Sequence, residues 1–325
     1  MTMQALVWTG NHNVTVRDQP QPIPADGWVL VDVAYCGLCG TDLHICAGEH
    51  PRSKPGLVIG HEISGTVHAD RAGFAAGTKV VVDPLLPCGA CPPCRNRRPH
   101  TCASLRLIGI DVPGGAARQV AVPADRLIPA PDTADLRQLA FAEPLAVAVR
   151  AVRRSGLRLG EQVVVAGAGP VGLAVATCAR LAGAATVVVA EPLPVRRKLA
   201  ANLGFEIVET FAGLSADVFF DAAGHPSVAA GMTAVAAPTS RIILVGVYGM
   251  PTTVDLQAAT FKELTIIGSR VYSRDDIRTA TEMIATGRFD AEPFLTRTVP
   301  LDGAASAIDE LRAGREVKVL VEGAA

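Results

Sequence analysis

Aromatic side chains are scarce in this chain, because Phe, Tyr and Trp together make up only 4% of its 325 residues. Its cores must therefore be packed mainly with Ala, Val and Leu, and a hydrophobic content of 49% is sufficient for that. A surplus of one charge is also missing: 30 basic and 31 acidic residues give a net charge of -1. A nucleic-acid partner, which calls for a basic patch, is not favoured. The length favours two domains.

Targeting and membrane signals are also lacking. Met1–Gly10 has neither the basic start nor the apolar run of a signal peptide. The apolar stretch Val163–Ala190 could be mistaken for a membrane span, but glycines, a proline and Arg180 interrupt it. We expect it to form a strand, a turn, a helix and a second strand, each too short to cross a bilayer. The sequence thus predicts a cytoplasmic protein without a membrane partner.

Two kinds of secondary-structure pattern divide the chain. The first third has short β-like runs between Gly and Pro residues, such as Trp28–Tyr35 and Thr78–Asp83, which is typical of an all-β, barrel-like domain. From about Phe141, apolar strands alternate with helical segments, which predicts an α/β domain with a parallel sheet. Its strands are expected near 162–166, 186–190, 217–221, 241–246 and 264–268, with a remnant strand at 206–209 in a shortened segment between Gly204 and Asp217.

A glycine-rich turn indicates a dinucleotide site. Gly167-x-Gly169-x-x-Gly172 stands between a predicted strand and a predicted helix, and the acidic residue Glu191 ends the next strand. The pyrophosphate is then expected on the helix N-terminus. Glu191 favours NAD over NADP because a carboxylate accepts hydrogen bonds from ribose hydroxyls and repels a 2′-phosphate. The expected cofactor contacts are Gly167, Gly169, Pro170, Val171, Gly172 and Glu191, with Arg196 weakening the preference slightly.

Four of the eight cysteines are closely spaced in one loop. Clustered cysteines in a chain without a signal peptide indicate metal binding more than disulfides. Four thiolates on a short loop are typical of a closed, structural zinc site. A disulfide pair and an iron–sulfur cluster are the alternatives. The four residues are Cys88, Cys91, Cys94 and Cys102.

A second metal signal lies earlier in the chain. Cys39-Gly-Thr-Asp-Leu-His44 and Gly60-His-Glu62 bring a thiol, imidazoles and carboxylates together, and such a mixture suits a catalytic zinc with an open position. Taken alone, Cys39 could be an inert buried thiol and His61 a structural residue. Cys36 and Cys39 also form a C-x-x-C, but the thioredoxin-like context of a redox pair is lacking.

Together these motifs resemble the zinc-dependent medium-chain alcohol dehydrogenase family from Met3 to Glu322, particularly its butanediol, sorbitol and threonine dehydrogenase branch. The resemblance implies a GroES-like, β-rich catalytic domain at 1–143 and 275–325. It implies a Rossmann domain, a doubly wound parallel sheet, at 144–274. It also implies a homodimer or homotetramer. The motifs that carry it are Cys36-Gly-Leu-Cys-Gly-Thr-Asp-Leu-His44, Gly60-His-Glu62, the four-cysteine loop and Glu143-Pro-Leu-Ala-Val-Ala148.

The resemblance assigns roles to the second cluster. Cys39, His61 and Glu143 are implied to hold a catalytic zinc, and Glu62 to coordinate or to exchange with water. Asp42 is implied to orient His61. Thr41 and His44 are implied to carry the hydroxyl proton, through the nicotinamide ribose, to solvent. The expected cofactors are thus NAD and two zinc ions per chain, one catalytic and one structural.

The expected function is hydride transfer between NAD and a small secondary alcohol or ketone, such as a vicinal diol, a polyol or a cyclitol. Oxidation of an amino alcohol such as L-threonine is the alternative enzyme activity. A non-catalytic nucleotide-binding protein is the alternative from another class. Arg270 and Tyr272 lie near the place where polyol-type relatives have polar substrate contacts. Packing roles are expected for Cys36, Cys46 and Cys178.

Overall fold

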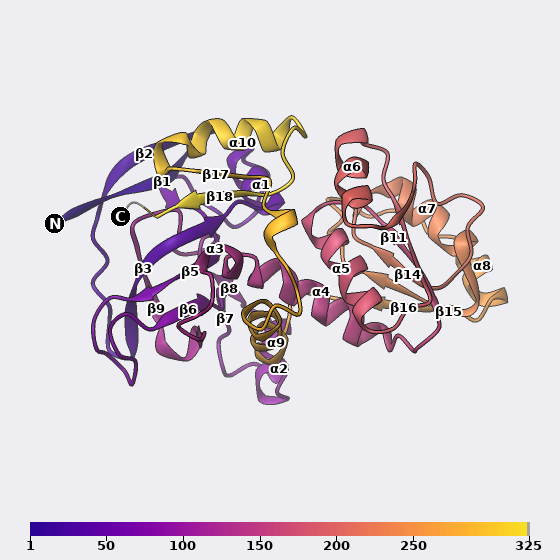
Figure 1. Cartoon of the computed structure of the whole chain (residues 1–325), viewed down its shortest axis with the longest axis horizontal. Coiled ribbons are helices and arrows are strands. Elements are labelled where there is room, and N and C mark those ends of the chain that lie inside the picture. Colours follow the sequence, from indigo (N-terminus) through magenta and orange to yellow (C-terminus); the bar gives the residue numbers. More distant parts are fainter. Residues whose placement is uncertain (324–325) are drawn as a thin grey trace. The chain divides into compact units, whose positions relative to one another are not determined.

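The computed structural model describes residues 1–323, and its internal contacts divide the chain into two compact units (Figure 1). Unit 1 contains Met1–Glu143 and the segment that starts at Ser273, and unit 2 contains Pro144–Tyr272. The chain thus leaves unit 1, forms unit 2 and returns. For this reason the yellow C-terminal strands of Figure 1 lie beside the indigo N-terminal ones.

Unit 1 is built on a sheet of seven strands in the order β10-β6-β5-β3-β18-β17, with β9 paired to the first half of β3. Its pairs are antiparallel except β17 with β18. In β3 the buried residues Val29, Val31 and Val33 alternate with more exposed ones, because successive side chains of a strand point to opposite faces. Two smaller sheets, β2-β1-β4 and β7-β8, complete a β-rich fold, as predicted.

The strands of unit 1 are β1 (Thr2–Gly10), β2 (Asn13–Pro20), β3 (Trp28–Gly37), β4 (Leu57–Val58), β5 (Glu62–Val67), β6 (Lys79–Val82), β7 (Leu85–Leu86), β8 (Arg106–Leu107), β9 (Gln119–Pro123), β10 (Leu127–Pro129), β17 (Arg297–Val299) and β18 (Val319–Glu322). Its helices are α1 (Gly40–Cys46), α2 (Pro92–Arg95), α3 (Leu136–Leu139), α9 (Arg274–Ala285) and α10 (Ala304–Arg312). Short 3₁₀ turns lie at Pro99–Thr101, Ala124–Arg126, Glu292–Phe294 and Leu301–Gly303. The helix α4 (Ala142–Ser155) leads from unit 1 into unit 2.

Unit 2 contains the predicted doubly wound parallel sheet. Its six strands lie in the order β13-β12-β11-β14-β15-β16, so the chain builds outward from β11 to one side and then from β14 to the other. Ligands of such sheets bind where the strand order reverses, which here is at the carboxyl ends of β11 and β14. The strands are β11 (Gln162–Ala166), β12 (Thr186–Ala190), β13 (Glu206–Val208), β14 (Ala216–Asp221), β15 (Ala236–Leu244) and β16 (Thr265–Gly268).

The shortened segment after Gly204 still completes the sheet. β13 forms the remnant strand that the sequence predicts, and it pairs in parallel with β12 through Val188–Ala190. The helices of unit 2 besides α4 are α5 (Pro170–Leu181), α6 (Pro194–Asn202), α7 (Pro226–Val235) and α8 (Leu256–Phe261). β11, α5 and β12 account for the apolar stretch 163–190. Within residues 1–323, helices with the length and apolar character of a membrane span are absent.

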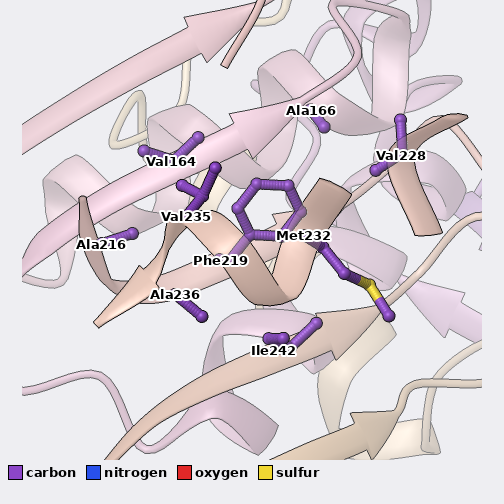
Figure 2. Packing of buried hydrophobic residues seen from close by; sticks show 9 residues of the cluster. All are labelled: Val164, Ala166, Ala216, Phe219, Val228, Met232, Val235, Ala236 and Ile242. Carbon is purple, nitrogen blue, oxygen red and sulfur yellow. The ribbon is translucent and has the colours of Figure 1, made fainter. Parts of the chain in front are cut away.

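A core of apolar side chains packs α7 against the sheet (Figure 2). Phe219 of β14 is fully buried among Val164, Met232 and Ile242, which come from β11, α7 and β15. Phe211 meets the Phe219 ring edge-on, with the ring centroids 5.4 Å apart. Aliphatic side chains otherwise fill this cluster, as the scarcity of aromatics requires.

Candidate metal centres and dinucleotide site

Cys39 is the N-cap residue of α1, two residues after the end of strand β3. The Asp42 carboxylate accepts a hydrogen bond from the Cys39 backbone N–H at 2.8 Å and closes the first helical turn. Its other oxygen accepts a hydrogen bond from the Gly60 N–H at 3.3 Å. Asp42 is completely buried, so one carboxylate fixes both segments that carry Cys39 and His61.

His61 is buried, with only 4% of its surface exposed. Asp42 was expected to orient it, but the contact between the two side chains is not a hydrogen bond. The His61 Nδ1 lies 3.8 Å from the nearer Asp42 oxygen, which is an ion-pair distance but too long for a hydrogen bond. Among the described residues this Nδ1 has no hydrogen-bond partner. Asp42 thus acts on His61 through its charge and through the Gly60 backbone, and not through a direct hydrogen bond.

Cys39, His61 and Glu62 form a compact group whose ligand atoms all lie within 4.8 Å of one another. A tetrahedral zinc ion with bonds of about 2.0–2.3 Å holds its ligand atoms roughly 3.3–3.8 Å apart. Small shifts of the three side chains would therefore bring their ligand atoms to the distances that zinc requires. Burial by itself lowers the pKa of His61, but the negative charges of Asp42, Cys39 and Glu143 raise it well above its usual value. A buried site with this charge attracts a cation, and its donor atoms fit zinc.

Glu62 is bound to a buried cation that the sequence analysis missed, Lys318. The Lys318 ammonium donates hydrogen bonds to the Glu62 carboxylate and, at 3.0 Å, to the Leu38 carbonyl. Burial lowers the pKa of Lys318, but the Glu62 carboxylate and the other negative groups raise it overall. Gly37 makes room for the pair, because a Cβ there would lie 2.0 Å from a Glu62 oxygen. A single Lys among Val317, Val319 and Leu320 was the available sequence signal.

The two residues expected to move a proton both lie on α1. The Thr41 hydroxyl is 3.9 Å from the Cys39 sulfur. His44 is exposed, and its Nδ1 lies 2.8 Å from a carboxylate oxygen of Glu49. An imidazole held by a carboxylate can accept a proton and release it to water. Glu49 was not singled out from the sequence.

The four-cysteine loop brings its sulfur atoms together within 4.8 Å. The Sγ of Cys91 lies 3.4 Å from that of Cys94 and 3.8 Å from that of Cys102. Tetrahedral zinc with Zn–S bonds of about 2.3 Å separates its sulfurs by about 3.8 Å, so the loop fits a structural ion. Hydrogen bonds from the Ala90 and Cys91 backbone N–H groups lower the pKa of Cys88 to about 6. This thiol is therefore ready to bind a metal at neutral pH.

The glycine turn after β11 has the features of a phosphate cradle. Gly167 has φ +102°, and a Cβ on Gly172 would lie 2.0 Å from the Gly167 carbonyl oxygen, so the helix approaches the strand closely. Gly169 caps α5 without a side-chain hydrogen bond, and the space beside it is open. The first N–H groups of α5, which begins with Pro170 and Val171, are thus free of a side-chain cap. Such a helix N-terminus binds a pyrophosphate.

Glu191 directly follows β12 and is only 3% exposed. One carboxylate oxygen accepts a hydrogen bond from the Ala168 N–H at 2.8 Å, and the other accepts one from the Leu193 N–H at 2.9 Å. The acid is therefore fixed against the glycine turn. An Nη of Arg196 lies 4.0 Å from the carboxylate, close enough to offset part of its charge.

A second buried acid lies at the same edge of the sheet and was missed by the sequence analysis. Asp221 ends β14, and one of its oxygens accepts hydrogen bonds from the N–H groups of Ala223 and Gly224. Tyr248 donates its hydroxyl to the other oxygen. Burial and the Asp221 charge raise the pKa of Tyr248, so the phenol stays protonated. This contact fixes the loop after β15 beside the strand-order reversal.

The remaining candidates do not belong to either group of metal-ligand atoms that the described residues form. Arg270 is exposed, whereas Tyr272 is completely buried. Cys36, Cys46 and Cys178 are buried, and burial is the main reason why the pKa of each thiol lies above its ordinary value. These three thiols are packing residues.

Comparison with known families agrees with the fold. Residues 25–132 match the family described as "Alcohol dehydrogenase GroES-like domain", and residues 170–286 match "Zinc-binding dehydrogenase". Fold and matches together define the class as zinc-binding dehydrogenases. The chain belongs to the zinc-dependent medium-chain alcohol dehydrogenase family, whose members are oxidoreductases that use a nucleotide cofactor on small-molecule alcohols.

Individual relatives are similar along their whole length. A 2-dehydro-3-deoxy-L-galactonate 5-dehydrogenase of Pseudoalteromonas atlantica is 38% identical, over 98% of each chain. The crystal structure of a protein described as a zinc-binding dehydrogenase, from Sinorhizobium meliloti and bound to NADP, has a TM-score of 0.93 at 32% identity, over 99% of each chain. An alcohol dehydrogenase of Escherichia coli in complex with NADH has a TM-score of 0.91 at 28% identity, also over 99% of each chain.

Proposed function

We propose that this protein is a zinc- and NAD-dependent dehydrogenase of a secondary alcohol in a vicinal diol, polyol or related polyhydroxylated chain. The observation that carries the proposal is the buried group of Cys39, His61 and Glu62, whose donor atoms and negative surroundings fit a zinc ion. The glycine turn of unit 2 supplies the site for the hydride acceptor. In this proposal unit 1 is the catalytic domain and unit 2 is the NAD-binding domain.

Cys39, His61 and Glu143 would hold the catalytic zinc, with Glu62 as an exchangeable fourth partner. A zinc ion held there would supply the positive charge that makes the substrate hydroxyl easier to deprotonate. The chain contributes the positioning, since Asp42 fixes the Cys39 and Gly60 backbones. The four loop cysteines would hold a second, structural zinc, giving two ions per chain.

Thr41 and His44 would remove the proton of the substrate hydroxyl. Thr41 is beside the Cys39 sulfur, so its hydroxyl can accept the proton close to the zinc ligand. His44 is exposed and paired with Glu49, so it can deliver a proton to solvent. Residues of one helix thus span the path from the metal group to water.

The substrate class is tested by NADH formation with a panel of vicinal diols, polyols, cyclitols, polyhydroxylated carboxylates and L-threonine. A polyhydroxylated chain is favoured because the relative from Pseudoalteromonas atlantica is named for oxidation at carbon 5 of a sugar acid. We expect at least one diol, polyol or sugar acid to be oxidised with the highest kcat/KM. Activity confined to L-threonine would establish the amino-alcohol alternative. A zinc-loaded protein that oxidises none of these compounds would establish the non-catalytic alternative.

The NAD preference is assigned to Glu191. Replacing Glu191 with alanine is expected to lower the ratio of kcat/KM for NAD to that for NADP by about tenfold or more, because a hydrogen bond to a charged group contributes about 1.5–3 kcal/mol. Steady-state kinetics with both cofactors measure this ratio. Arg196→Ala is the matched comparison and should move the ratio in the opposite direction, since Arg196 lies within 4.0 Å of the carboxylate. An unchanged ratio in Glu191→Ala rules out this assignment.

Two further inferences accompany this function. All eight cysteines are free, which suits a reducing compartment such as the cytoplasm. A homodimer or homotetramer remains a prediction from the family resemblance.

A further inference from the structure

One buried carboxylate of unit 2 joins two loops at the carboxyl edge of its sheet. Asp221 is the last residue of β14 and is completely buried. One of its carboxylate oxygens accepts hydrogen bonds from the N–H groups of Ala223 at 3.0 Å and Gly224 at 2.9 Å, in the loop after β14. Its backbone carbonyl accepts from the N–H groups of Val245 and Gly246, which directly follow β15, at 2.9 and 2.8 Å. Asp221 therefore holds the starts of both loops.

The two loops touch backbone to backbone. A Cβ on Gly246 would lie 2.2 Å from the Gly224 nitrogen, and a Cβ on Gly224 would lie 2.8 Å from the Val247 carbonyl oxygen. Gly224 also has a φ of +62°, a conformation that favours glycine. The glycines thus let the loops approach so closely that neither can shift far without moving the other.

Tyr248 fixes the part of the second loop that lies beyond these backbone contacts. Its hydroxyl donates a hydrogen bond to the second carboxylate oxygen of Asp221. Its neighbours in the loop are exposed, Val247 by 91% and Met250 by 69%. A segment with few buried contacts opens easily, whereas a hydrogen bond to a carboxylate is about twice as strong as one between neutral groups. The bond from Tyr248 to Asp221 is therefore a main restraint on this loop.

The loop that Tyr248 restrains lies at the edge of the sheet where dinucleotides bind. In a doubly wound sheet a dinucleotide crosses the point where the strand order reverses, with one mononucleotide on each side. Here the reversal lies between β11 and β14. The glycine turn after β11 and Glu191 after β12 are assigned to the pyrophosphate and the adenosine ribose. The nicotinamide half then belongs to the side of β14 and β15, where Asp221 and Tyr248 lie.

We propose that Tyr248 is a positioning residue: through Asp221 it holds the loop 245–250 in the conformation that binds the nicotinamide half of the dinucleotide, and so limits how fast NADH leaves. A loop that is ordered before binding costs less free energy to immobilise when the ligand arrives. A loop that opens more often releases its ligand sooner. The inference rests on the proposed function in one respect, the binding of NAD and NADH at the glycine turn of unit 2.

The test compares full-length wild-type protein with Tyr248→Phe, which keeps the ring and removes the hydroxyl. NADH release is followed by stopped-flow fluorescence after mixing with excess NAD. We expect release to become about tenfold faster or more in the variant, because a hydrogen bond to a charged group is lost. ADP binding, measured by calorimetry, should stay unchanged, since ADP contains the adenosine and the pyrophosphate but no nicotinamide. In the cofactor-free variant, hydrogen exchange of residues 245–250 should be faster.

Two further variants separate positioning from general structural support. Asp221→Asn keeps an oxygen for the N–H groups of Ala223 and Gly224 but replaces the charged acceptor with a neutral amide. NADH release from it should be faster than from wild type and slower than from Tyr248→Phe. Tyr35→Phe is the matched control, since it removes the hydroxyl of a tyrosine in β3 of unit 1. It should leave NADH release and ADP binding unchanged.

Equal rates of NADH release from Tyr248→Phe and wild type would overturn the proposal. Equal weakening of ADP and NADH binding would also overturn it, because that result indicates general damage to unit 2. If Tyr248→Phe does not fold, Asp221→Asn decides, and an unchanged release rate in that variant refutes the positioning role. Wild-type protein that binds no NADH would instead remove the proposed function, so the two failures are distinguishable.

Discussion

Replacing Cys39 with alanine should lower kcat/KM for alcohol oxidation by at least about a thousandfold, because a bound metal supplies several kcal/mol of transition-state stabilisation. Cys39 offers the only thiolate of its metal group, while His61 and Glu62 supply nitrogen and oxygen. Without the thiolate, the remaining imidazole and carboxylate groups are expected to hold zinc poorly. We therefore expect the variant to lose about one zinc ion per chain. Elemental analysis and NADH formation measure the two effects on the same preparation.

Cys46→Ala is the matched control for this substitution. Cys46 is a buried thiol on the same helix, and burial raises its pKa to about 12, so it is a neutral packing group. Zinc content and kcat/KM should remain close to wild type in this control. Cofactor binding should survive in Cys39→Ala, because the glycine turn belongs to unit 2. Full activity in Cys39→Ala would refute a zinc mechanism at this site.

Replacing Cys102 with serine should lower the thermal stability of the protein sharply while leaving the catalytic metal group intact. The cysteine loop contains only the four-residue helix α2 and the short turn Pro99–Thr101, so it has little apolar core of its own. A structural zinc ion contributes folding energy directly. If the net loss is about 3–5 kcal/mol, the midpoint of unfolding falls by roughly 10 °C for a unit of this size. Calorimetry together with a zinc count measures the effect.

Cys178→Ala provides the comparison for the loop variant. Cys178 is a buried thiol of α5 with no metal ligand role, and burial alone raises its pKa to about 12. It should keep both zinc ions and shift the unfolding midpoint by only a few degrees. A Cys102→Ser protein with one zinc ion fewer but an unchanged midpoint would show that the loop ion has no structural role.

Much of unit 2 could be predicted from the sequence because its signals are local. Buried parallel strands are continuous apolar runs, and β11, β12, β14 and β15 each contain one. The remnant strand β13 was also predictable, because a strand of three residues at the edge of the sheet fits into the shortened segment after Gly204. The contact between Asp221 and Tyr248 was not predictable, because the two residues are far apart in the chain and neither belongs to the glycine motif.

In unit 1 the ligand types were visible, but their partners were not. The seven-residue helix α1 is too short for helical periodicity to show, so the sequence gives no sign that Thr41 and His44 share a helix. Lys318 meets Glu62 only because the last strand returns to pair with β3. Asp42 bonds to two backbone N–H groups, a detail that residue types do not encode. Contacts between residues that are far apart in the sequence thus complete the site, and the motifs alone do not predict them.

The most direct test of the whole account is NADH formation from the best substrate of the panel before zinc removal, after it and after zinc is restored. We expect oxidation to stop when the Cys39 site is emptied and to return when one zinc ion per chain is added back. The cysteine-loop ion should be retained throughout, as a zinc count will show. Undiminished oxidation by protein whose Cys39 site holds no metal would contradict the account.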